Sequence, residues 1–187
     1  MILTRQAPFH KLLNSKKRDG FDALSRVDEQ RLSRTDKAGA VFQIGRCATG
    51  DLSCLMAMYH RFSPKPASQG LPPPDLDTCG KWINELIQIG ENLLAWHEQE
   101  VIGHAALIPD VNRGSGEYVI FVHQDYRNRG IGTALTHAIL DKARNLGFQS
   151  LWLTVAITNA IAIRLYVKLG FQYCDMDECE RTMRITL

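Results

Sequence analysis

The 187-residue sequence predicts one mixed α/β or α+β domain in which helices cover a sheet. First, short runs of aromatic and β-branched residues, typical of strands, alternate with segments whose apolar residues recur every three or four positions. Second, an apolar fraction of 45% suffices for the core of one globular domain. Third, residues 117–145 form a continuous strand, polar glycine-containing turn and helix, around which the other elements are arranged.

Composition excludes several classes of function. The formal net charge of +2 favours neither a nucleic-acid partner nor an acidic membrane surface. No apolar run approaches the roughly 20 residues of a transmembrane helix, and the N-terminus lacks an apolar signal core, so we expect a cytoplasmic protein. An odd number of cysteines without a Cys-x-x-Cys pair predicts reduced thiols and no metal site. The cysteines are Cys47, Cys54, Cys79, Cys174 and Cys179.

The first 39 residues differ from the rest of the chain. They are rich in Lys, Arg, Asp and Ser and have no sustained hydrophobic period, although residues 22–34 are compatible with one or two helical turns. We therefore expect a loosely attached N-terminal extension over residues 1–39 and a folded domain over residues 40–187.

The first half of the domain is predicted to be strand, helix, loop, helix and hairpin. Thr49, Gly50 and Asp51 supply a capping signal for the first helix, and Asp77 or Thr78 can cap the second. Five of the seven prolines fall in residues 63–75, which excludes regular structure there. The expected elements are a strand at 40–47, helices at 52–62 and 77–89, and a β-hairpin formed by 92–97 and 100–108.

The second half contains the central strand and helix. Residues 117–123 are strand-like, and the helix that follows carries Ile131, Leu135 and Ile139 on one apolar face, ending before Gly147. The remaining expected elements are a strand at 150–156, a helix at 159–169 stopped by Gly170, and strands at 171–174 and 181–187.

The turn between the central strand and helix suits an anion. The first N–H groups of a helix have no intrahelical partner and carry a partial positive charge. Glycines at 130 and 132 let an anion approach these groups, and Arg127 and Arg129 add positive charge and forked donors. A phosphate or pyrophosphate is the simplest ligand; the alternative is an ordinary turn with surface arginines.

Two motifs make the first interpretation more specific. Residues 127–132, Arg-Asn-Arg-Gly-Ile-Gly, resemble R/Q-x-x-G-x-G/A, the acetyl-CoA pyrophosphate loop of the Gcn5-related N-acetyltransferase (GNAT) family. Residues 159–171 resemble that family's N-x-x-A-x-x-L-Y-x-K-x-G-F. The resemblance covers residues 40–187 and implies a mixed, mostly antiparallel sheet flanked by helices. It also implies transfer of an acetyl group from acetyl-CoA to a primary amine by direct attack in a ternary complex, without a metal.

The resemblance assigns roles by position. Tyr166 would donate a proton to the leaving thiolate, since an ordinary pKa of about 10 keeps it protonated at neutral pH; the alternative is a helix residue packed on the sheet. Val122 would offer its backbone N–H to the thioester carbonyl. The residues expected to bind the pantetheine arm are Ile120, Phe121, Val122 and Asn159, and those expected to bind the pyrophosphate are Asn128, Arg129, Gly130, Ile131, Gly132 and Thr133.

The general base is assigned by position as well. Many GNAT members have a carboxylate early in the central strand, where this chain has Glu117; the alternative is a solvated carboxylate at a strand end. His123 is the runner-up, because an ordinary pKa near 6.5 suits proton transfer, while His104 is interpreted as structural. Members that acetylate protein N-termini carry a Glu five residues before the motif Asn159, where this chain has Thr154.

The acceptor is left open by the sequence. Residues 58–64, Met-Tyr-His-Arg-Phe-Ser-Pro, resemble a run in GNAT domains that acetylate protein lysines, whereas the proline-rich residues 69–74 depart from those domains. A small amine metabolite and a protein lysine both fit, and a homodimer is compatible with either. The alternative to an enzyme is a regulatory or sensor domain that binds acetyl-CoA with weak catalysis.

Overall fold

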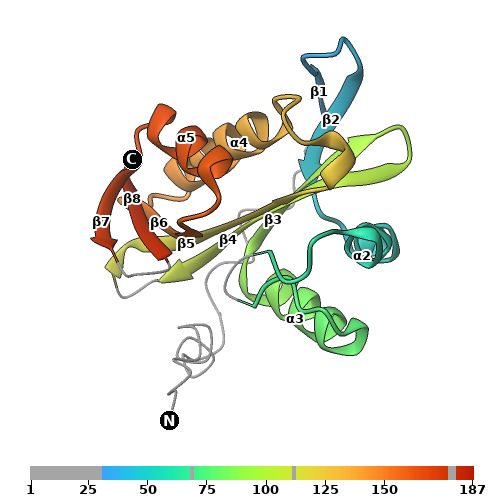
Figure 1. Ribbon diagram of the computed structural model, residues 1–187, viewed down its shortest axis with the longest axis horizontal. Coiled ribbons are helices and arrows are strands. Elements are labelled where there is room, and N and C mark those ends of the chain that lie inside the picture. Colours follow the sequence, from blue (N-terminus) through green and yellow to red (C-terminus); the bar gives the residue numbers. More distant parts are fainter. Residues whose placement is uncertain (1–30, 68–69, 111–112, 177–179) are drawn as a thin grey trace. The chain divides into compact units, whose positions relative to one another are not determined.

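The domain is built on one large sheet (Figure 1). The computed structural model describes residues 31–67, 70–110, 113–176 and 180–187, which belong to one compact unit, Arg31–Leu187. Within them, eight strands form a sheet in the order β1-β2-β3-β4-β5-β6-β8-β7. The expected mixed, mostly antiparallel sheet flanked by helices is confirmed.

The elements follow the predicted order, with one additional strand and small shifts at their ends. The strands are β1 (Leu32–Thr35), β2 (Val41–Arg46), β3 (Glu91–His97), β4 (Glu100–Asp110), β5 (Ser115–Val122), β6 (Ser150–Ala156), β7 (Gln172–Met176) and β8 (Glu180–Thr186). The helices are α2 (Leu52–Arg61), α3 (Leu76–Ile89), α4 (Ile131–Asn145) and α5 (Ala160–Lys168), with 3-10 turns η1 (Thr49–Asp51) and η3 (Gln124–Tyr126).

The additional strand, β1, lies at the start of the compact unit. It pairs with β2 in a register that runs from Leu32↔Ile44 to Thr35↔Val41, so the compact unit starts at Arg31 and not at residue 40. Residues 32–34 are therefore strand and not helical turn, and residues 1–30 lie outside the described part. All four residues of β1 are exposed, which explains why no hydrophobic pattern revealed it.

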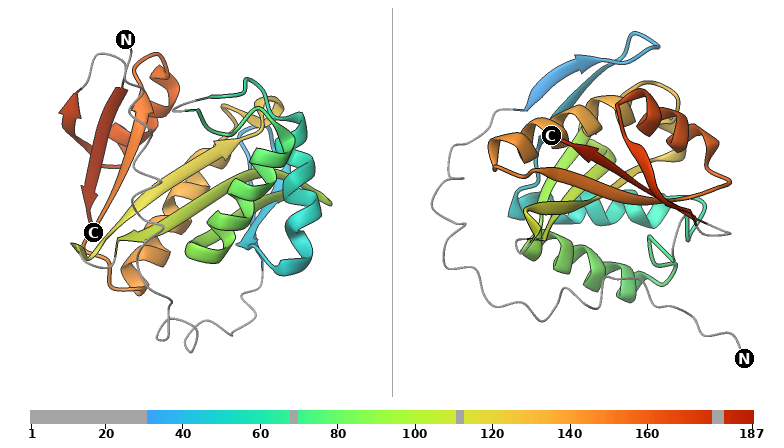
Figure 2. Two further views of the ribbon diagram at one scale, coloured as in Figure 1. Left: turned by 90° about the horizontal axis from the view of Figure 1, so that it is seen from below. Right: turned by 90° about the vertical axis from the view of Figure 1, so that its left-hand side faces the viewer.

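The sheet opens between its two central strands. β5 and β6 are parallel, and their ladder consists of Ser115↔Ser150, Gly116↔Leu151 and Glu117↔Trp152. Beyond Glu117 the two strands separate, as Figure 2 shows. The other neighbouring strands pair antiparallel. One edge of β5 is therefore left open from Tyr118 onwards.

Helices cover both faces of this sheet: α4 and α5 lie on one face, α2 and α3 on the other (Figures 1 and 2). A Cβ atom at Gly103 of β4 would lie 2.9 Å from Cδ1 of Leu135 in α4, so a larger residue there would have to displace that leucine side chain. On the opposite face, the ring of Phe121 lies 5.8 Å from those of Tyr59 in α2 and Trp82 in α3. Successive residues of β5 alternate between the two helical layers.

The cap of α3 differs from the prediction. Asp75 is the N-cap, and its Oδ1 accepts a hydrogen bond from the N–H of Thr78 at 2.8 Å. The cap predicted at Asp77 or Thr78 is therefore wrong. An Asp two or three residues earlier gives the same sequence signal, because several polar residues precede the apolar face.

In the described ranges, no helix is long and apolar enough to cross a membrane.

Candidate active site

The open edge of β5 presents backbone groups to a ligand. The N–H of His123 donates to the carbonyl oxygen of Ile102 at 2.9 Å. Because an antiparallel ladder alternates, odd-numbered β5 residues bond to β4, and even-numbered residues turn their N–H and C=O groups away from it. Phe121, expected to bind the pantetheine arm, thus directs its backbone groups towards β4. The even-numbered residues beyond the last β6 pair are Tyr118, Ile120 and Val122.

The turn after β5 has a backbone suited to an anion. Asn128 (φ 64°) and Gly130 (φ 93°) adopt the left-handed conformation, which favours glycine and tolerates asparagine. Helix α4 starts at Ile131, so the N–H groups of its first turn, which includes Thr133, have no partner inside the helix. These groups together form a backbone site suited to an anion.

Gly132 lies beside that turn and close to three side chains. A Cβ atom at this position would lie 3.5 Å from the side chain of Leu165, 3.8 Å from that of Val122 and 4.0 Å from that of Ile120. Gly132 thus lies where the start of α4, the end of β5 and helix α5 meet. A ligand that runs from the turn to the open edge would pass this point.

Arg127 and Gln124 tie the turn to the end of α2. Arg127 donates to the carbonyl oxygens of Val122 at 3.2 Å and Ser63 at 2.7 Å. The side-chain amide of Gln124 donates to the carbonyl oxygen of Arg61 at 2.9 Å, and its oxygen accepts from the N–H of Ser63 at 3.0 Å. Two of the five N–H donors of Arg127 are thus used within the protein, and the proline-rich loop begins beside the turn.

Arg129 has different surroundings from Arg127. Its side chain is 40% exposed and lies 3.9 Å from the carboxylate of Asp36. Its guanidinium carbon stands 5.1 Å from the ring centroid of Tyr126. Arg129 can therefore add positive charge to a ligand in the turn.

Glu117 is buried where β5 and β6 separate. The residue is 8% exposed, and its Oε2 has no hydrogen-bond partner in the described part of the chain. Burial raises the pKa of this carboxyl from 4.5 to about 7. By the alternation of β5, Glu117 shares the face of Phe121, which is covered by α2 and α3. Its partner Trp152 and the next residue on that face of β6, Thr154, lie on the same side.

Tyr166 lies on the opposite face. It is 6% exposed, and its ring is 6.4 Å from that of Tyr118, the residue after Glu117, and 5.6 Å from that of Phe171. Burial raises the pKa of Tyr166 well above its usual value near 10, so the phenol stays protonated. The hydroxyl of Tyr118 is held by Thr136 at 2.8 Å. Glu117 and Tyr166 therefore flank the opening of the sheet from opposite faces.

Asn159 caps helix α5. Its Oδ1 accepts a hydrogen bond from the N–H of Ala162 at 3.1 Å. This bond satisfies one of the unpaired N–H groups at the start of the helix that carries Tyr166. The expected contact of Asn159 with the pantetheine arm stays a prediction.

His104 belongs to a buried hydrogen-bond chain, as its structural interpretation predicts. Its Nδ1 is 2.8 Å from the hydroxyl of Tyr59, and its Nε2 is 2.9 Å from Oδ1 of Asn92. The amide nitrogen of Asn92 donates to the carbonyl oxygens of Leu86 and Gly90. Oδ1 of Asn92 must therefore accept, so His104 carries its proton on Nε2 and Tyr59 donates to Nδ1. Burial lowers the pKa of His104 to about 3.

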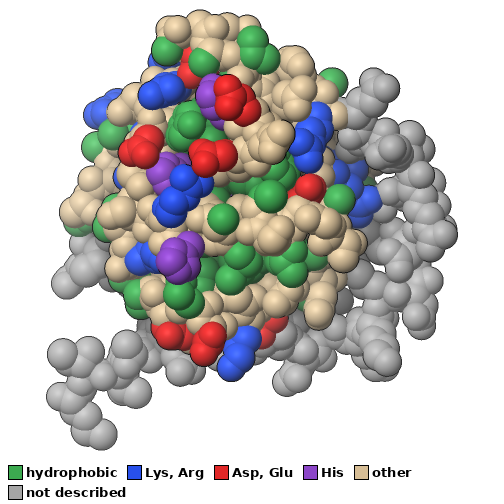
Figure 3. Space-filling model, turned by 90° about the vertical axis from the view of Figure 1, so that its right-hand side faces the viewer, with side chains coloured by type: hydrophobic (Ala, Val, Ile, Leu, Met, Phe, Trp, Pro, Cys, Tyr) green, Lys and Arg blue, Asp and Glu red, His purple; other side chains and the backbone are tan. Residues whose placement is uncertain are grey.

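His123, the runner-up base, follows the other end of β5. At about 3.3 Å per residue it is about 20 Å along the strand from Glu117. It lines a pocket of about 200 Å³ with Arg61 and Arg129, among others; neither Glu117 nor Tyr166 lines it. Figure 3, which faces α2 and the β3–β4 turn, shows charged and histidine side chains gathered on this side. Across the described residues, no group of three or more His, Cys, Asp or Glu could hold a metal ion.

Two residues beside the turn were not predicted from the sequence. Asp36 and Lys37 lie in the connection between β1 and β2, and the N–H of Lys37 donates to the carbonyl oxygen of Arg129 at 3.0 Å. The available signal was the Asp-Lys-Ala-Gly run at 36–39, which favours a tight turn between two extended segments.

The sequence matches a known family over most of this site. The profile of the Acetyltransferase (GNAT) family matches residues 55–171, more than half of the chain. The chain belongs to the GNAT family. The matched range includes Glu117, the turn at 128–133 and Tyr166, and the expected family resemblance is confirmed.

Solved GNAT structures share the fold. The GNAT domain of S. lividans PAT superposes with a TM-score of 0.71 at 15% identity, covering 84% of this chain and 97% of that one. The putative acetyltransferase yncA from Salmonella typhimurium, solved with its cofactor acetyl-CoA, gives a TM-score of 0.64 at 21% identity, covering 78% and 94%. At these identities the similarity shows the GNAT fold alone.

Curated GNAT relatives act on different acceptors. The [ribosomal protein bS18]-alanine N-acetyltransferase of Escherichia coli (strain K12) is 44% identical over 52 residues, 28% of this chain and 35% of that protein. The chain thus spans about a third of that relative's length. The L-methionine sulfoximine/L-methionine sulfone acetyltransferase of Pseudomonas aeruginosa is 27% identical over 129 residues, 65% of this chain and 75% of that protein. Membership of the GNAT family therefore does not fix the acceptor.

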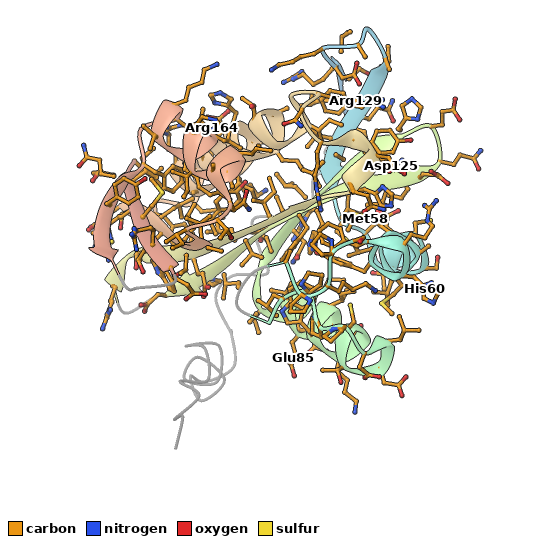
Figure 4. The ribbon with its side chains drawn as sticks, in the orientation of Figure 1. Met58, His60, Glu85, Asp125, Arg129 and Arg164 are labelled. Atoms are coloured by element: carbon orange, nitrogen blue, oxygen red, sulfur yellow. The ribbon has the colours of Figure 1, made fainter. Side chains whose placement is uncertain are left out.

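The apolar residues of the run at 58–64 in this GNAT chain are packing residues. Met58, Tyr59 and Phe62 are 0%, 1% and 4% exposed. In Figure 4, Met58 points towards the sheet and His60 points away from it. Because packing against the sheet accounts for the apolar members of the run, its resemblance to lysine-modifying GNAT domains gives little information on the acceptor.

Proposed function

We propose that this GNAT chain transfers the acetyl group of acetyl-CoA to a primary amine by direct attack in a ternary complex. The observation that carries the proposal is the opening of the sheet, flanked by Glu117 on one face and Tyr166 on the other. Acetyl-CoA supplies the activated acyl group. Its pyrophosphate would be held by residues 128–133, and its pantetheine arm by Ile120 and Val122.

Every proton in the proposed transfer has a donor and an acceptor. The amine nitrogen forms a bond to the thioester carbonyl carbon, the carbon–sulfur bond breaks, and its electron pair leaves with the sulfur. Tyr166 gives its phenolic proton to that sulfur. Glu117 takes the proton lost by the amine through a water molecule, and a pKa of about 7 leaves it half ionised near neutral pH. Solvent then restores both groups.

Ile120 is the backbone donor that we favour for the thioester carbonyl, in place of Val122. The amine and the carbonyl carbon must approach to about 3–3.5 Å. Along the strand, Ile120 is about 10 Å from Glu117 and Val122 about 16 Å. A carboxylate that acts through one water can serve an amine beside Ile120 but not one beside Val122. The N–H of Val122 would then hold the pantetheine arm.

A small primary amine is the acceptor that we favour over a protein N-terminus. The relative named for L-methionine sulfoximine matches 65% of this chain, against 28% for the relative named for a ribosomal-protein alanine. Thr154 shares the face of Glu117, and its hydroxyl cannot replace the glutamate that N-terminus-modifying members carry there. A protein lysine is the alternative acceptor.

The test measures thiol release from acetyl-CoA with amino-acid analogues, polyamines, lysine peptides and alanine-starting peptides. We expect turnover with a small amine and a loss of kcat of about 10²-fold or more in Tyr166→Phe, because general acids contribute about 10²–10⁴-fold. The Kd for acetyl-CoA should change little. The matched control is Tyr173→Phe, since Tyr173 is 47% exposed on β7 and should keep full activity.

The same panel separates the enzyme from a regulatory domain that only binds acetyl-CoA. The regulatory alternative rests on position 154, where the chain has a threonine and no second carboxylate. Binding of acetyl-CoA without turnover of any acceptor would support the regulatory domain. An unchanged kcat in Tyr166→Phe would remove Tyr166 from the mechanism, and a chain that binds no acetyl-CoA would contradict both functions.

A further inference from the structure

The connection between β1 and β2 lies against the anion-binding turn. The N–H of Lys37 donates to the carbonyl oxygen of Arg129 at 3.0 Å. The guanidinium of Arg129 lies 3.9 Å from the carboxylate of Asp36, and Figure 4 shows Arg129 beside this hairpin. A segment that is distant in the sequence is thus in direct contact with the turn.

Asp36 gives this connection a fixed shape. Its Oδ1 accepts hydrogen bonds from the N–H groups of Ala38 at 2.8 Å and Ala40 at 2.9 Å, and its side chain is 3% exposed. Gly39 adopts φ 85°, and its N–H donates to the carbonyl oxygen of Asp36 at 3.1 Å. These three hydrogen bonds and the left-handed glycine hold the turn in one conformation before any ligand binds.

The bond between Lys37 and Arg129 orients one peptide group of the turn. In a trans peptide the C=O of Arg129 and the N–H of Gly130 point in opposite directions. Because the carbonyl points to the hairpin, the N–H of Gly130 points away from it and is not used by the hairpin. Asn128 and Gly130 are left-handed. When left-handed residues alternate with right-handed ones, successive backbone N–H groups point towards one anion.

The aliphatic stem of the Lys37 side chain lies at the same point. Its Cγ lies 3.8 Å from the position that a Cβ on Gly130 would occupy, so its aliphatic stem covers the start of α4. Lys37 is exposed, and it forms no ion pair with any residue in the described ranges. The adjacent acid, Asp36, faces Arg129 instead.

We propose that the β1–β2 connection is part of the cofactor site and that Lys37 is an additional binding residue for the pyrophosphate of CoA. Its backbone N–H holds the peptide between Arg129 and Gly130, and its ammonium pairs with the pyrophosphate. This inference rests on the proposed function, which makes acetyl-CoA the ligand. The pyrophosphate is favoured over the 3′-phosphate because the lysine stem lies at the start of α4, where the helix N–H groups bind phosphate.

The test compares CoA binding to the full chain by titration calorimetry in the wild type, Lys37→Ala and Arg34→Ala. Arg34 is exposed on β1 of the same hairpin, so its removal causes the same change in net charge. At low salt, Lys37→Ala should weaken CoA binding about fivefold, the size of a good exposed ion pair, and Arg34→Ala by less than about twofold. The loss in Lys37→Ala should shrink as salt rises.

Two further measurements make the assignment falsifiable. An equal loss with CoA and 3′-dephospho-CoA is expected; a loss confined to CoA would assign Lys37 to the 3′-phosphate and overturn the proposal. Hydrogen exchange of residues 36–40 should slow when CoA saturates the protein. Unchanged exchange, or CoA binding by Lys37→Ala as tight as by Arg34→Ala, would also overturn it. A wild-type chain that fails to bind CoA would instead contradict the proposed function.

Discussion

Among single residues, Glu117 links the chemistry of the site to the stability of the fold. Its carboxyl has a pKa of about 7 when buried, against 4.5 in the unfolded chain. Between these values the folded state binds more protons than the unfolded state, so stability falls as pH rises through this range. Once Glu117 is ionised, above about pH 7, its burial costs about 3 kcal/mol. The ionised form that the proposed base role requires is therefore the form that destabilises the protein.

This cost can be measured with Glu117→Gln. The wild type should lose about 2–3 kcal/mol of unfolding free energy between pH 5 and pH 8 that Glu117→Gln keeps, since a glutamine does not ionise. Urea denaturation at the two pH values measures the difference. In the same variant the rise of kcat/KM centred near pH 7 should be lost.

The matched control for Glu117→Gln is Glu100→Gln. Glu100 is 54% exposed and pairs with Arg61 at 3.3 Å. Its removal should therefore change the free energy of unfolding at pH 5 and at pH 8 by less than about 0.5 kcal/mol. A Glu117→Gln variant whose stability falls between pH 5 and pH 8 as much as that of the wild type would contradict the raised pKa.

Site residues whose role depends on their neighbours in the sequence could be predicted. Contacts between segments that are far apart in the sequence could not. The glycine at 130 follows from the left-handed backbone that starts α4, and its spacing from Arg127 is set within one turn. The commitment of Arg127 to Ser63 and the contact of Lys37 with Arg129 join segments that are far apart in the chain. No periodicity in the sequence encodes such contacts.

At the scale of elements, the chain of Tyr59, His104 and Asn92 connects both helices of one layer to the sheet. Tyr59 belongs to α2, His104 to β4 and Asn92 to β3, and the amide of Asn92 binds the end of α3 through Leu86. Because His104 has its pKa lowered to about 3, the folded state binds fewer protons than the unfolded state between about pH 3 and 6.5. Its contribution to stability is complete above pH 6.5 and is lost as pH falls.

Removal of His104 should loosen this layer. His104→Phe leaves the hydroxyl of Tyr59 and the oxygen of Asn92 buried without partners, so we expect a loss of about 2–4 kcal/mol in the free energy of unfolding. Denaturant melts at pH 7.5 measure it. Combination with Tyr59→Phe should cost less than the sum of the two single changes, because both remove the same bond. Full additivity would argue against the hydrogen-bonded chain, and the exposed His60→Asn serves as control.

The elements themselves were largely predictable because their patterns are local. The helices carry apolar residues at helical spacing, and the buried strands are rich in branched and aromatic residues. β1 has four exposed residues, and only its pairing with β2 makes it a strand. Its position, and with it the start of the compact unit at Arg31, depends on a partner that a single segment does not reveal.

For the whole molecule, β1 determines where the chain can be shortened. Without residues 1–30, the compact unit Arg31–Leu187 keeps β1, and we expect its Tm and CoA affinity to stay close to those of the full chain. Without residues 1–39, the edge of β2 is uncovered and Lys37 is lost. That variant should self-associate through the exposed strand edge and bind CoA more weakly. Light scattering and calorimetry measure the two effects; equal behaviour of both variants would contradict this role of β1.

The separation of β5 from β6 also has a mechanical consequence. The sheet has two parts, β1–β5 and β6–β8, and their strands are joined by a ladder of three residue pairs. A donor molecule bound along the open edge would bridge the two parts of the sheet where β5 and β6 no longer pair. Release of the CoA product would remove that bridge. The two parts of the sheet should therefore move most freely relative to each other between turnovers, when the next pair of substrates has to enter.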